Sequence, residues 1–228
     1  MSAVFVVDRA GFFGGDWPQG FVAMPPTGGA EFLAAARRAG RYEPRELAER
    51  TPAWKQWIPY CVLRCGVTEP AGRPAAVFRV QRTSGQSETR LHGLWSIGLG
   101  GHVEPFDEPG PSASVDPESF FERALRRELD EELTLPPAAA TVRPRFVGVL
   151  NDDATPVGAV HAGLVYLLDL PGPFAEIAKS AAVRETSKMR GGFGSLVELA
   201  NLWQTPSRFE SWSQFLIQAG LAGPMVET

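Results

Sequence analysis

The sequence predicts a mixed α/β fold, in which a mixed β-sheet carries helices on its faces. Strand-like segments rich in Val, Ile and Leu alternate with a few amphipathic helical segments. The length of 228 residues and the 44% hydrophobic content suit one domain with an extension. Neither an internal repeat nor a clear interdomain linker is visible. We therefore expect residues 1–52 to be an N-terminal extension packed on the core and residues 53–228 to be the main domain.

The first half of the chain predicts four strands and one helix. The extension has a short strand at Val4–Val7 and a helix from Ala30 to Ala39, which ends at Gly40. Three further strands follow, over Gln56–Val67, Ala75–Arg82 and Leu91–Leu99. Pro59 donates no hydrogen bond, so the first of these is expected at a sheet edge or to begin after the proline.

The second half begins with an irregular loop over residues 105–116, rich in Pro, Gly and Ser. Asp116 as N-cap and Pro117 at the first position predict a helix over residues 117–133. Strands are then expected over Arg145–Leu150 and Val157–Leu170, and residues 171–193 are expected to be irregular. Two helices, Ser195–Asn201 and Ser207–Ala219, complete the prediction.

The predicted helix 117–133 ends in an unusual concentration of acidic residues. At about 100° per residue it carries one apolar stripe, formed by Phe121, Leu125, Leu129 and Leu133. Glu132 falls inside this stripe, and Glu128 lies at its margin. Glu131 lies beside Glu128, whereas Asp130 points to the opposite side of the helix. Carboxylates beside an apolar layer need a cationic partner, and clustered oxygen ligands suit Mg²⁺ or Mn²⁺. A solvated helix with ion pairs to Arg126 and Arg127 is the simpler alternative.

Charge and composition exclude several classes of protein. The formal net charge is −4 and no dense Lys/Arg block occurs, which argues against nucleic-acid binding. No apolar run approaches the roughly 20 residues of a membrane span, and we expect neither a signal peptide nor a membrane partner. Cys61 and Cys65 are expected to be buried free thiols, which favours a reducing, cytoplasmic location.

The acidic segment and the glycines before it resemble the Nudix box. That signature is Gly-x5-Glu-x7-Arg-Glu-U-x-Glu-Glu-x-Gly-U, where U is a bulky aliphatic residue. Arg127-Glu128-Leu129-Asp130-Glu131-Glu132 matches its core in full, and Ser96–Glu104 resembles the strand and glycine loop that precede the box. In three places the sequence departs from the signature. Asp107 replaces the first glutamate, twelve extra residues precede Arg127, and Thr134 replaces the last glycine.

The resemblance implies a Nudix α/β/α sandwich and a metal-dependent pyrophosphohydrolase that cleaves a nucleoside diphosphate linked to another moiety. The metal, Mg²⁺ or Mn²⁺, would be held by Glu128, Glu131, Glu132 and the carbonyl of Gly100. By the same resemblance Glu128 would also act as general base, and Arg127 would orient a glutamate. Gly101, His102 and Glu185 are candidates for substrate binding, and Glu185 is also a candidate base. The substrate would be a small phosphorylated compound.

Other residues have a functional and a structural interpretation. His161 lies in an apolar strand, where a hydrogen-bonded core histidine is the simpler interpretation, and Asn151-Asp152-Asp153 has the composition of an ordinary turn. The aromatic side chains that offer a stacking surface are expected in the core, namely Trp54, Trp57, Trp95 and Phe106. Residues 1–52 are expected to cover the sheet or to form a homodimer contact. The alternative functions are a non-catalytic nucleotide sensor, and a prenyl diphosphate isomerase that the scattered histidines disfavour.

Overall fold

The structure is a computed structural model that describes residues 2–68, 72–83, 92–108, 117–184 and 186–223. Its contacts divide the chain into two compact units. The first unit consists of Met1–Tyr60, Gly100–Glu128 and Phe146–Tyr166, and the second of Cys61–Leu99, Leu129–Arg145 and Leu167–Thr228. The chain passes from one unit to the other inside β4, β7, α3, β9 and β10, so these five elements contribute residues to both.

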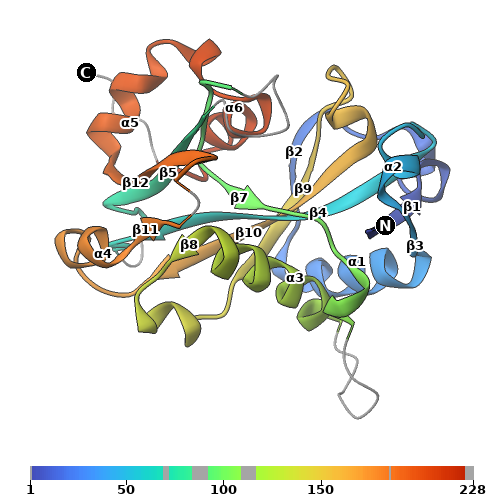
Figure 1. The fold of residues 1–228 in the computed structure, drawn as a ribbon, viewed down its shortest axis with the longest axis horizontal. Helices are drawn as coiled ribbons and strands as arrows, with labels where there is room; N and C mark the ends of the chain where they lie inside the picture. The colour runs from blue at the N-terminus through green and yellow to red at the C-terminus, as the bar shows by residue number, and fades with distance from the viewer. Residues whose placement is uncertain (1, 69–71, 84–91, 109–116, 185, 224–228) are drawn as a thin grey trace. The chain divides into compact units, whose positions relative to one another are not determined.

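The predicted mixed α/β fold is confirmed (Figure 1). The strands are β1 (Ala3–Asp8), β2 (Gly20–Ala23), β3 (Arg41–Pro44), β4 (Trp54–Cys65), β5 (Ala76–Arg82), β6 (Trp95–Ser96), β7 (Leu99–Gly100), β8 (Leu133–Thr134), β9 (Arg145–Asn151), β10 (His161–Leu170), β11 (Ala182–Val183) and β12 (Met189–Ser195). The α-helices are α1 (Pro26–Ala39), α2 (Arg45–Ala48), α3 (Pro117–Glu132), α4 (Phe174–Ser180), α5 (Leu196–Trp203) and α6 (Ser211–Gln218). Short 3₁₀ turns include η4 (Pro105–Asp107) and η6 (Gly158–Val160).

In the first unit, β1 pairs antiparallel with both β3 and β4, and β9 pairs antiparallel with β2. In the second unit, β12 pairs with β5 and β5 pairs with the end of β4, both antiparallel. β4 and β10 are neighbours in the strand order. They run in the same direction, because Lys55 at the start of β4 contacts the carbonyl of His161, while Arg64 near its end pairs with Asp169. Both strands are buried along nearly their whole length, as expected of strands covered on both faces.

The position of β4 corrects one prediction. Pro59 lies inside this strand, yet β4 has neighbours on both sides and is not an edge strand. Two of the ladders that β4 forms leave the proline out. β1 pairs with Trp54–Gln56 and β5 pairs with Arg64–Cys65, so neither ladder needs an N–H group from residue 59.

Other segments also differ from the prediction, and β2, β3 and α2 lie where no helix or strand was expected. The expected strand Leu91–Leu99 is interrupted between β6 and β7, where the Ile97 amide donates to Ser213 Oγ (2.9 Å) instead of to a strand. Residues 171–193 were expected to be irregular, but they contain α4, β11 and part of β12. β12 is hard to recognise because Gly191, Gly192 and Gly194 lower its strand propensity. Close packing requires Gly191, since a Cβ there would overlap the carbonyl of Arg79 in β5.

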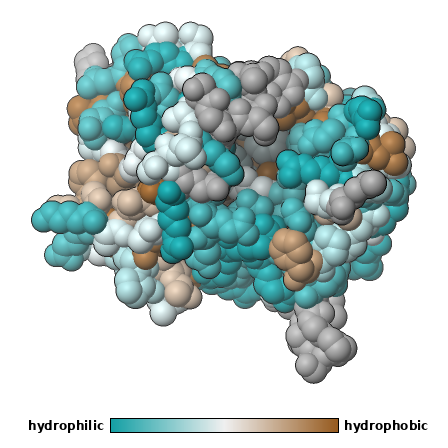
Figure 2. Space-filling view, viewed as in Figure 1, coloured by the Kyte–Doolittle hydropathy of each residue, from teal (hydrophilic) through white to brown (hydrophobic). Residues whose placement is uncertain are grey.

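The apolar stripe predicted for α3 lies in the core. Phe121, Leu125, Leu129 and Leu133 are all buried, and Cys61 and Cys65 are buried free thiols, as predicted. Hydrophilic side chains cover much of the face shown in Figure 2. Among the described residues, no helix is both long and apolar enough to cross a membrane.

Candidate functional site

The glycine loop after β7 belongs to the first unit and lies directly against α3. At Gly100, a Cβ atom would overlap the carbonyl oxygen of Pro59 in β4. At Gly101, a Cβ atom would overlap the carboxyl group of Glu128. Glycine is needed at position 100 because the neighbouring atoms are backbone and cannot move aside, whereas a side chain at position 101 would displace the Glu128 carboxyl group. The loop therefore places the backbone of Gly101 against the Glu128 carboxylate.

Arg127 connects this loop to the helix. Its Nε and Nη2 atoms donate to the two carboxylate oxygens of Asp107, at 3.0 and 3.1 Å. Nη1 donates to Glu128 Oε1 at 2.7 Å, and Nη2 also donates to the carbonyl of His102 at 2.8 Å. Burial opposes the charge of Arg127, but the hydrogen bonds to Asp107 and Glu128 outweigh it and raise the pKa of the guanidinium above its ordinary value. Arg127 thus holds Glu128 and the loop in one arrangement.

Asp107 is a structural partner of Arg127. Its side chain is buried, and Oδ2 also accepts a hydrogen bond from the backbone N–H of Glu104 at 2.8 Å. This bond closes η4, the turn that leads away from the glycine loop. Two strong contacts therefore fix a buried carboxylate that would otherwise be costly to ionise.

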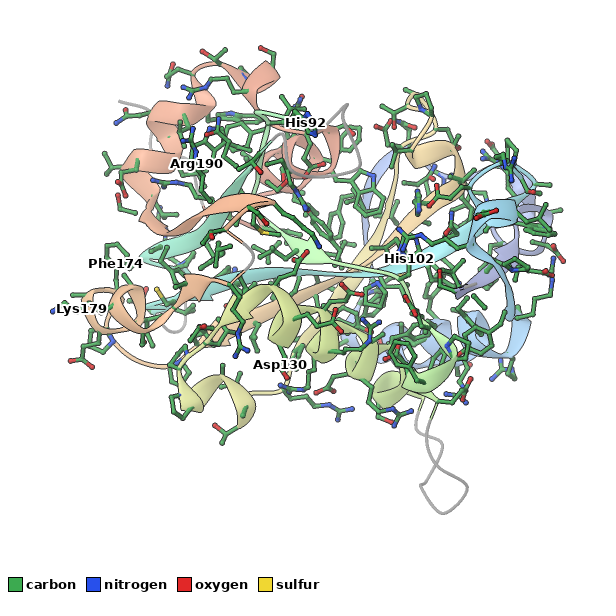
Figure 3. All side chains as sticks on the ribbon, viewed as in Figure 1. His92, His102, Asp130, Phe174, Lys179 and Arg190 are labelled. Atoms are coloured by element: carbon green, nitrogen blue, oxygen red, sulfur yellow. The ribbon has the colours of Figure 1, made fainter. Side chains whose placement is uncertain are left out.

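The last turn of α3 carries the remaining box carboxylates. Glu131 is exposed, Glu132 is half-buried, and Asp130 is exposed (Figure 3). α3 ends without the terminal glycine of the signature, because β8 follows at once and pairs antiparallel with β11. The amide of Arg184 donates to the carbonyl of Glu132 at 2.7 Å and so satisfies one of the last carbonyl groups of the helix.

Two histidines from distant parts of the sequence lie together. His102 follows the glycine loop, and its Nε2 lies 3.2 Å from Nε2 of His161 at the start of β10. Oε1 of Glu49, the residue that ends α2, lies 3.8 and 3.7 Å from these two nitrogens. Burial lowers the pKa of both histidines. Both are therefore neutral imidazoles at neutral pH.

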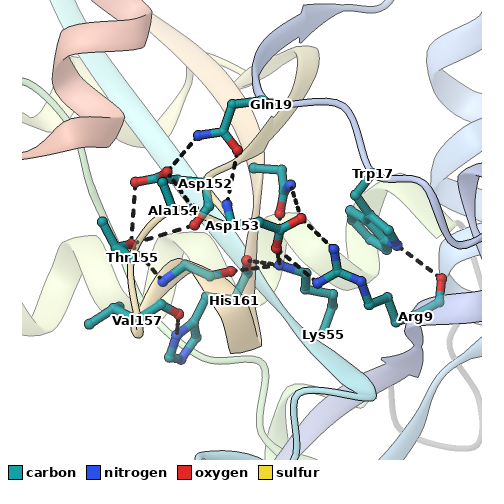
Figure 4. A network of polar contacts seen from close by, with 12 residues as sticks. Arg9, Trp17, Gln19, Lys55, Asp152, Asp153, Ala154, Thr155, Val157 and His161 are labelled. Carbon is teal, nitrogen blue, oxygen red and sulfur yellow. Dashed lines mark hydrogen bonds and ion pairs between the residues drawn. The ribbon is translucent and has the colours of Figure 1, made fainter.

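A buried network holds the turn that leads into His161 (Figure 4). Lys55 is fully buried, and its Nζ donates to Asn151 Oδ1 (2.8 Å), Asp153 Oδ1 (2.6 Å) and the carbonyl of Gly158 (2.6 Å). Arg9 forms a second ion pair with Asp153. The turn composition of Asn151-Asp152-Asp153 is therefore used structurally.

Comparison with known proteins identifies the family. No family model matches the sequence. The chain is similar to protein YmaB of Bacillus subtilis (strain 168), with 33% identity over 193 residues that cover 82% of each chain. It is also similar to the crystal structure of Tm1382, provisionally assigned as a Nudix hydrolase, with a TM-score of 0.68 and 25% identity over 95% of this chain and 97% of Tm1382. The chain belongs to the Nudix hydrolase family.

The Nudix signature explains which residues the first unit brings together. Asp107, at the place of the first box glutamate, reaches Arg127 although twelve extra residues separate them in comparison with the signature. Residues 109–116, which include the expected N-cap Asp116, lie outside the described residues, as does Glu185. Gly101, Arg127 and Glu128 are in contact, whereas the side chain of His102 is directed to His161.

Sequence reasoning did not single out two residues near these histidines, Glu49 and Lys55. A lone lysine within an apolar strand was a usable signal for Lys55, because a buried ammonium group needs several acceptors. The sequence around Glu49 gave no such signal, because Glu49 lies in a polar stretch. The two histidines near it in space, His102 and His161, are more than 50 residues away in the sequence. Of the four aromatic residues expected in the core, Trp57 is fully buried but Phe106 is 65% exposed and lies against the Arg127 guanidinium.

Proposed function

We propose that this Nudix protein is a metal-dependent pyrophosphohydrolase that cleaves the diphosphate bond of a nucleoside diphosphate linked to another moiety. The contact of Glu128 with Gly101 and Arg127 is the observation that carries the proposal. It fixes one carboxylate of the complete Arg-Glu-Leu-Asp-Glu-Glu core where the glycine loop meets α3. A residue whose only role was solubility would not need a glycine cradle.

The donor set fits a magnesium or manganese ion. Glu128, Glu131 and Glu132 are three carboxylates within the final turns of α3, and the carbonyl of Gly100 would add a backbone oxygen. All are oxygen ligands of the kind that Mg²⁺ and Mn²⁺ prefer. Such an ion, when bound, neutralises diphosphate oxygens and lowers the pKa of a bound water.

The residues of the chain would supply the remaining steps. Glu128 would accept a proton from the attacking water, whose oxygen forms a bond to phosphorus while the bond from phosphorus to the bridging oxygen breaks. Arg127 would act as a positioning residue, because its guanidinium holds Glu128 and also donates to Asp107 and the His102 carbonyl. Gly101 would keep the space above Glu128 free of a side chain.

The substrate class and location are part of the same proposal. The metal-binding carboxylates recognise only the diphosphate, so residues 1–52 and the insertion before α3 are the places where specificity would arise. The free thiols of Cys61 and Cys65 support a reducing, cytoplasmic location. A homodimer stays a prediction.

The test is hydrolysis of a panel of nucleoside triphosphates, dinucleoside polyphosphates, ADP-ribose, NADH and nucleotide sugars with Mg²⁺ or Mn²⁺. We expect turnover that is lost in EDTA and in the Glu128→Gln and Glu132→Gln variants. Asp130→Asn is the matched control, because it removes one charge from an exposed position of the same helix. Nucleotide binding without any turnover would favour the sensor function instead.

A further inference from the structure

A second group of ligating side chains lies in the first unit, apart from the box carboxylates. Glu49, His102 and His161 come from three distant parts of the sequence: the end of α2, the glycine loop and the start of β10. Among the described residues, they form a group whose ligand atoms all lie within 4.8 Å of one another. Two imidazoles and one carboxylate form a ligand set that occurs in zinc and non-haem iron sites.

The distances match the size of a metal ion. The three donor atoms form a triangle with sides of 3.2, 3.7 and 3.8 Å. The circle through its corners has a radius of about 2.1 Å, so an ion at its centre would lie at Zn–N and Zn–O bonding distance from all three atoms. The three donor atoms need not move to reach these distances. An ion slightly outside the plane would keep similar distances and leave positions open for water or an anionic oxygen.

His161 is held by a hydrogen bond from its other ring nitrogen, as metal-binding histidines usually are. Its Nδ1 lies 2.8 Å from the carbonyl of Val157. Since a carbonyl oxygen can only accept, Nδ1 carries the hydrogen, and the Nε2 lone pair of the neutral ring faces His102 and Glu49. Lys55 holds the same turn through the carbonyl of Gly158 at 2.6 Å (Figure 4). His161 is therefore preorganised with its ligating nitrogen directed into the group.

A purely structural explanation accounts for only part of this arrangement. A hydrogen bond between two neutral imidazoles explains the distance from His102 to His161, and Arg45 lies 3.8 Å from Glu49 Oε1. It does not explain why Glu49 Oε1 lies almost equally far from both ligating nitrogens, too far for a hydrogen bond to either. An ion between the three atoms would account for all three distances together.

We propose that Glu49, His102 and His161 bind one divalent transition-metal ion, with Zn²⁺ as the probe ion. Imidazole nitrogens favour zinc and its neighbours over Mg²⁺, so this site differs in selectivity from the carboxylates of α3. The two sites are linked through the loop, because the carbonyl of His102 accepts from Arg127, which also holds Glu128. The proposal does not depend on the hydrolytic activity.

The experiment measures Zn²⁺ binding to the full chain after removal of metals with EDTA, by competition with a chromogenic chelator. We expect one Zn²⁺ per chain, bound at least about tenfold more weakly by Glu49→Gln and His161→Asn. Glu46→Gln is the matched control, because it removes the same charge from an exposed position of α2. Co²⁺ in place of Zn²⁺ should give visible absorption bands that the Glu49→Gln variant loses.

Two results would overturn the proposal: wild-type protein that binds no stoichiometric Zn²⁺, or equal affinities in Glu49→Gln and Glu46→Gln. Glu49 is 39% exposed at its side chain, so its replacement tests the site even if the buried His161→Asn variant does not fold. Zn²⁺ affinity is also measured in Glu128→Gln. Retained Zn²⁺ binding with lost turnover there separates this site from the hydrolytic one.

Discussion

At the scale of single residues, the ion pair between Asp107 and Arg127 is the contact with the clearest consequences. Asp107 is buried and binds both Nε and Nη2 of Arg127, while the same guanidinium holds Glu128. The sequence predicted that Arg127 would orient a glutamate. It could not show that Asp107 anchors Arg127, because the insertion hides their relation in the spacing of the motif.

Asp107→Asn should lower the free energy of unfolding by about 2 kcal/mol, because a buried guanidinium loses its charged partner. Turnover should fall as well, since Glu128 is held through Arg127. A double-mutant cycle in urea checks the pairing. In the Asp107→Asn background, Arg127→Met should cost about 1 kcal/mol less than in the wild type. Additive effects of the two changes would contradict a direct interaction.

Gly101→Ala should reduce metal-dependent turnover strongly with little loss of stability. Its Cβ would overlap the Glu128 carboxyl group, which is the end of a flexible side chain and can rotate away. The carboxylate would then leave its place while the fold survives. Gly192→Ala is the control, because a Cβ at that position in β12 has no atom within 4 Å. Steady-state kinetics measure the turnover of both variants, and thermal unfolding measures their stability. Equal activities of the two variants would refute this function of Gly101.

At the scale of elements, local patterns predicted most of the helices and strands, and tertiary contacts explain the failures. α3 and β9 begin where the sequence placed them, because apolar periodicity and a proline at the first helical position are local signals. β12 was missed because its glycines are required by the approach of β5, which no local pattern reveals. The group formed by Glu49, His102 and His161 was missed for a related reason: it is assembled by three elements.

The turn between β9 and β10 should make the protein sensitive to acid. Burial alone would raise the pKa of Asp153. The hydrogen bonds from Arg9, Lys55 and Asn151 together lower it by more than burial raises it, so the pKa lies below its ordinary value. The stabilisation by Asp153 is therefore complete above about pH 4, the pKa of an unfolded aspartate, and is lost as the pH falls below that value. Urea unfolding of the wild type and Asp153→Asn should differ by about 2 kcal/mol at pH 7.

That difference should shrink towards pH 2, because the Asp153 carboxylate of the unfolded chain becomes protonated there while the native carboxylate stays ionised, so that folding must release a proton. Asp169→Asn serves as a comparison, since within the described part of the chain Asp169 forms its ion pair with Arg64. A difference between wild type and Asp153→Asn that stays constant from pH 7 to pH 2 would show that the charge of Asp153 does not matter for stability.

At the scale of the whole molecule, the sequence predicted the fold class and the family because the glycine loop and the acidic helix match the two parts of one signature in order. It could not predict the two compact units, since each is assembled from three separate stretches of the chain. Residues 1–52 belong entirely to the first unit. The boundary after residue 52 stays a prediction, and deletion of these residues tests it.

Deletion of residues 2–52 should leave a chain that does not fold cooperatively. It removes β1, which pairs with β4, and the buried side chains Val4, Val6 and Leu33. The Phe5 amide, which donates to the carbonyl of Val103 after the glycine loop, is lost as well. Near-ultraviolet circular dichroism and thermal unfolding of residues 53–228 measure the effect. Co-expression of residues 1–52 as a separate chain is the control and should restore part of the native signal. A cooperative transition of residues 53–228 alone would instead show that the N-terminal segment is a dispensable cover, and that the glycine loop keeps its place without β1.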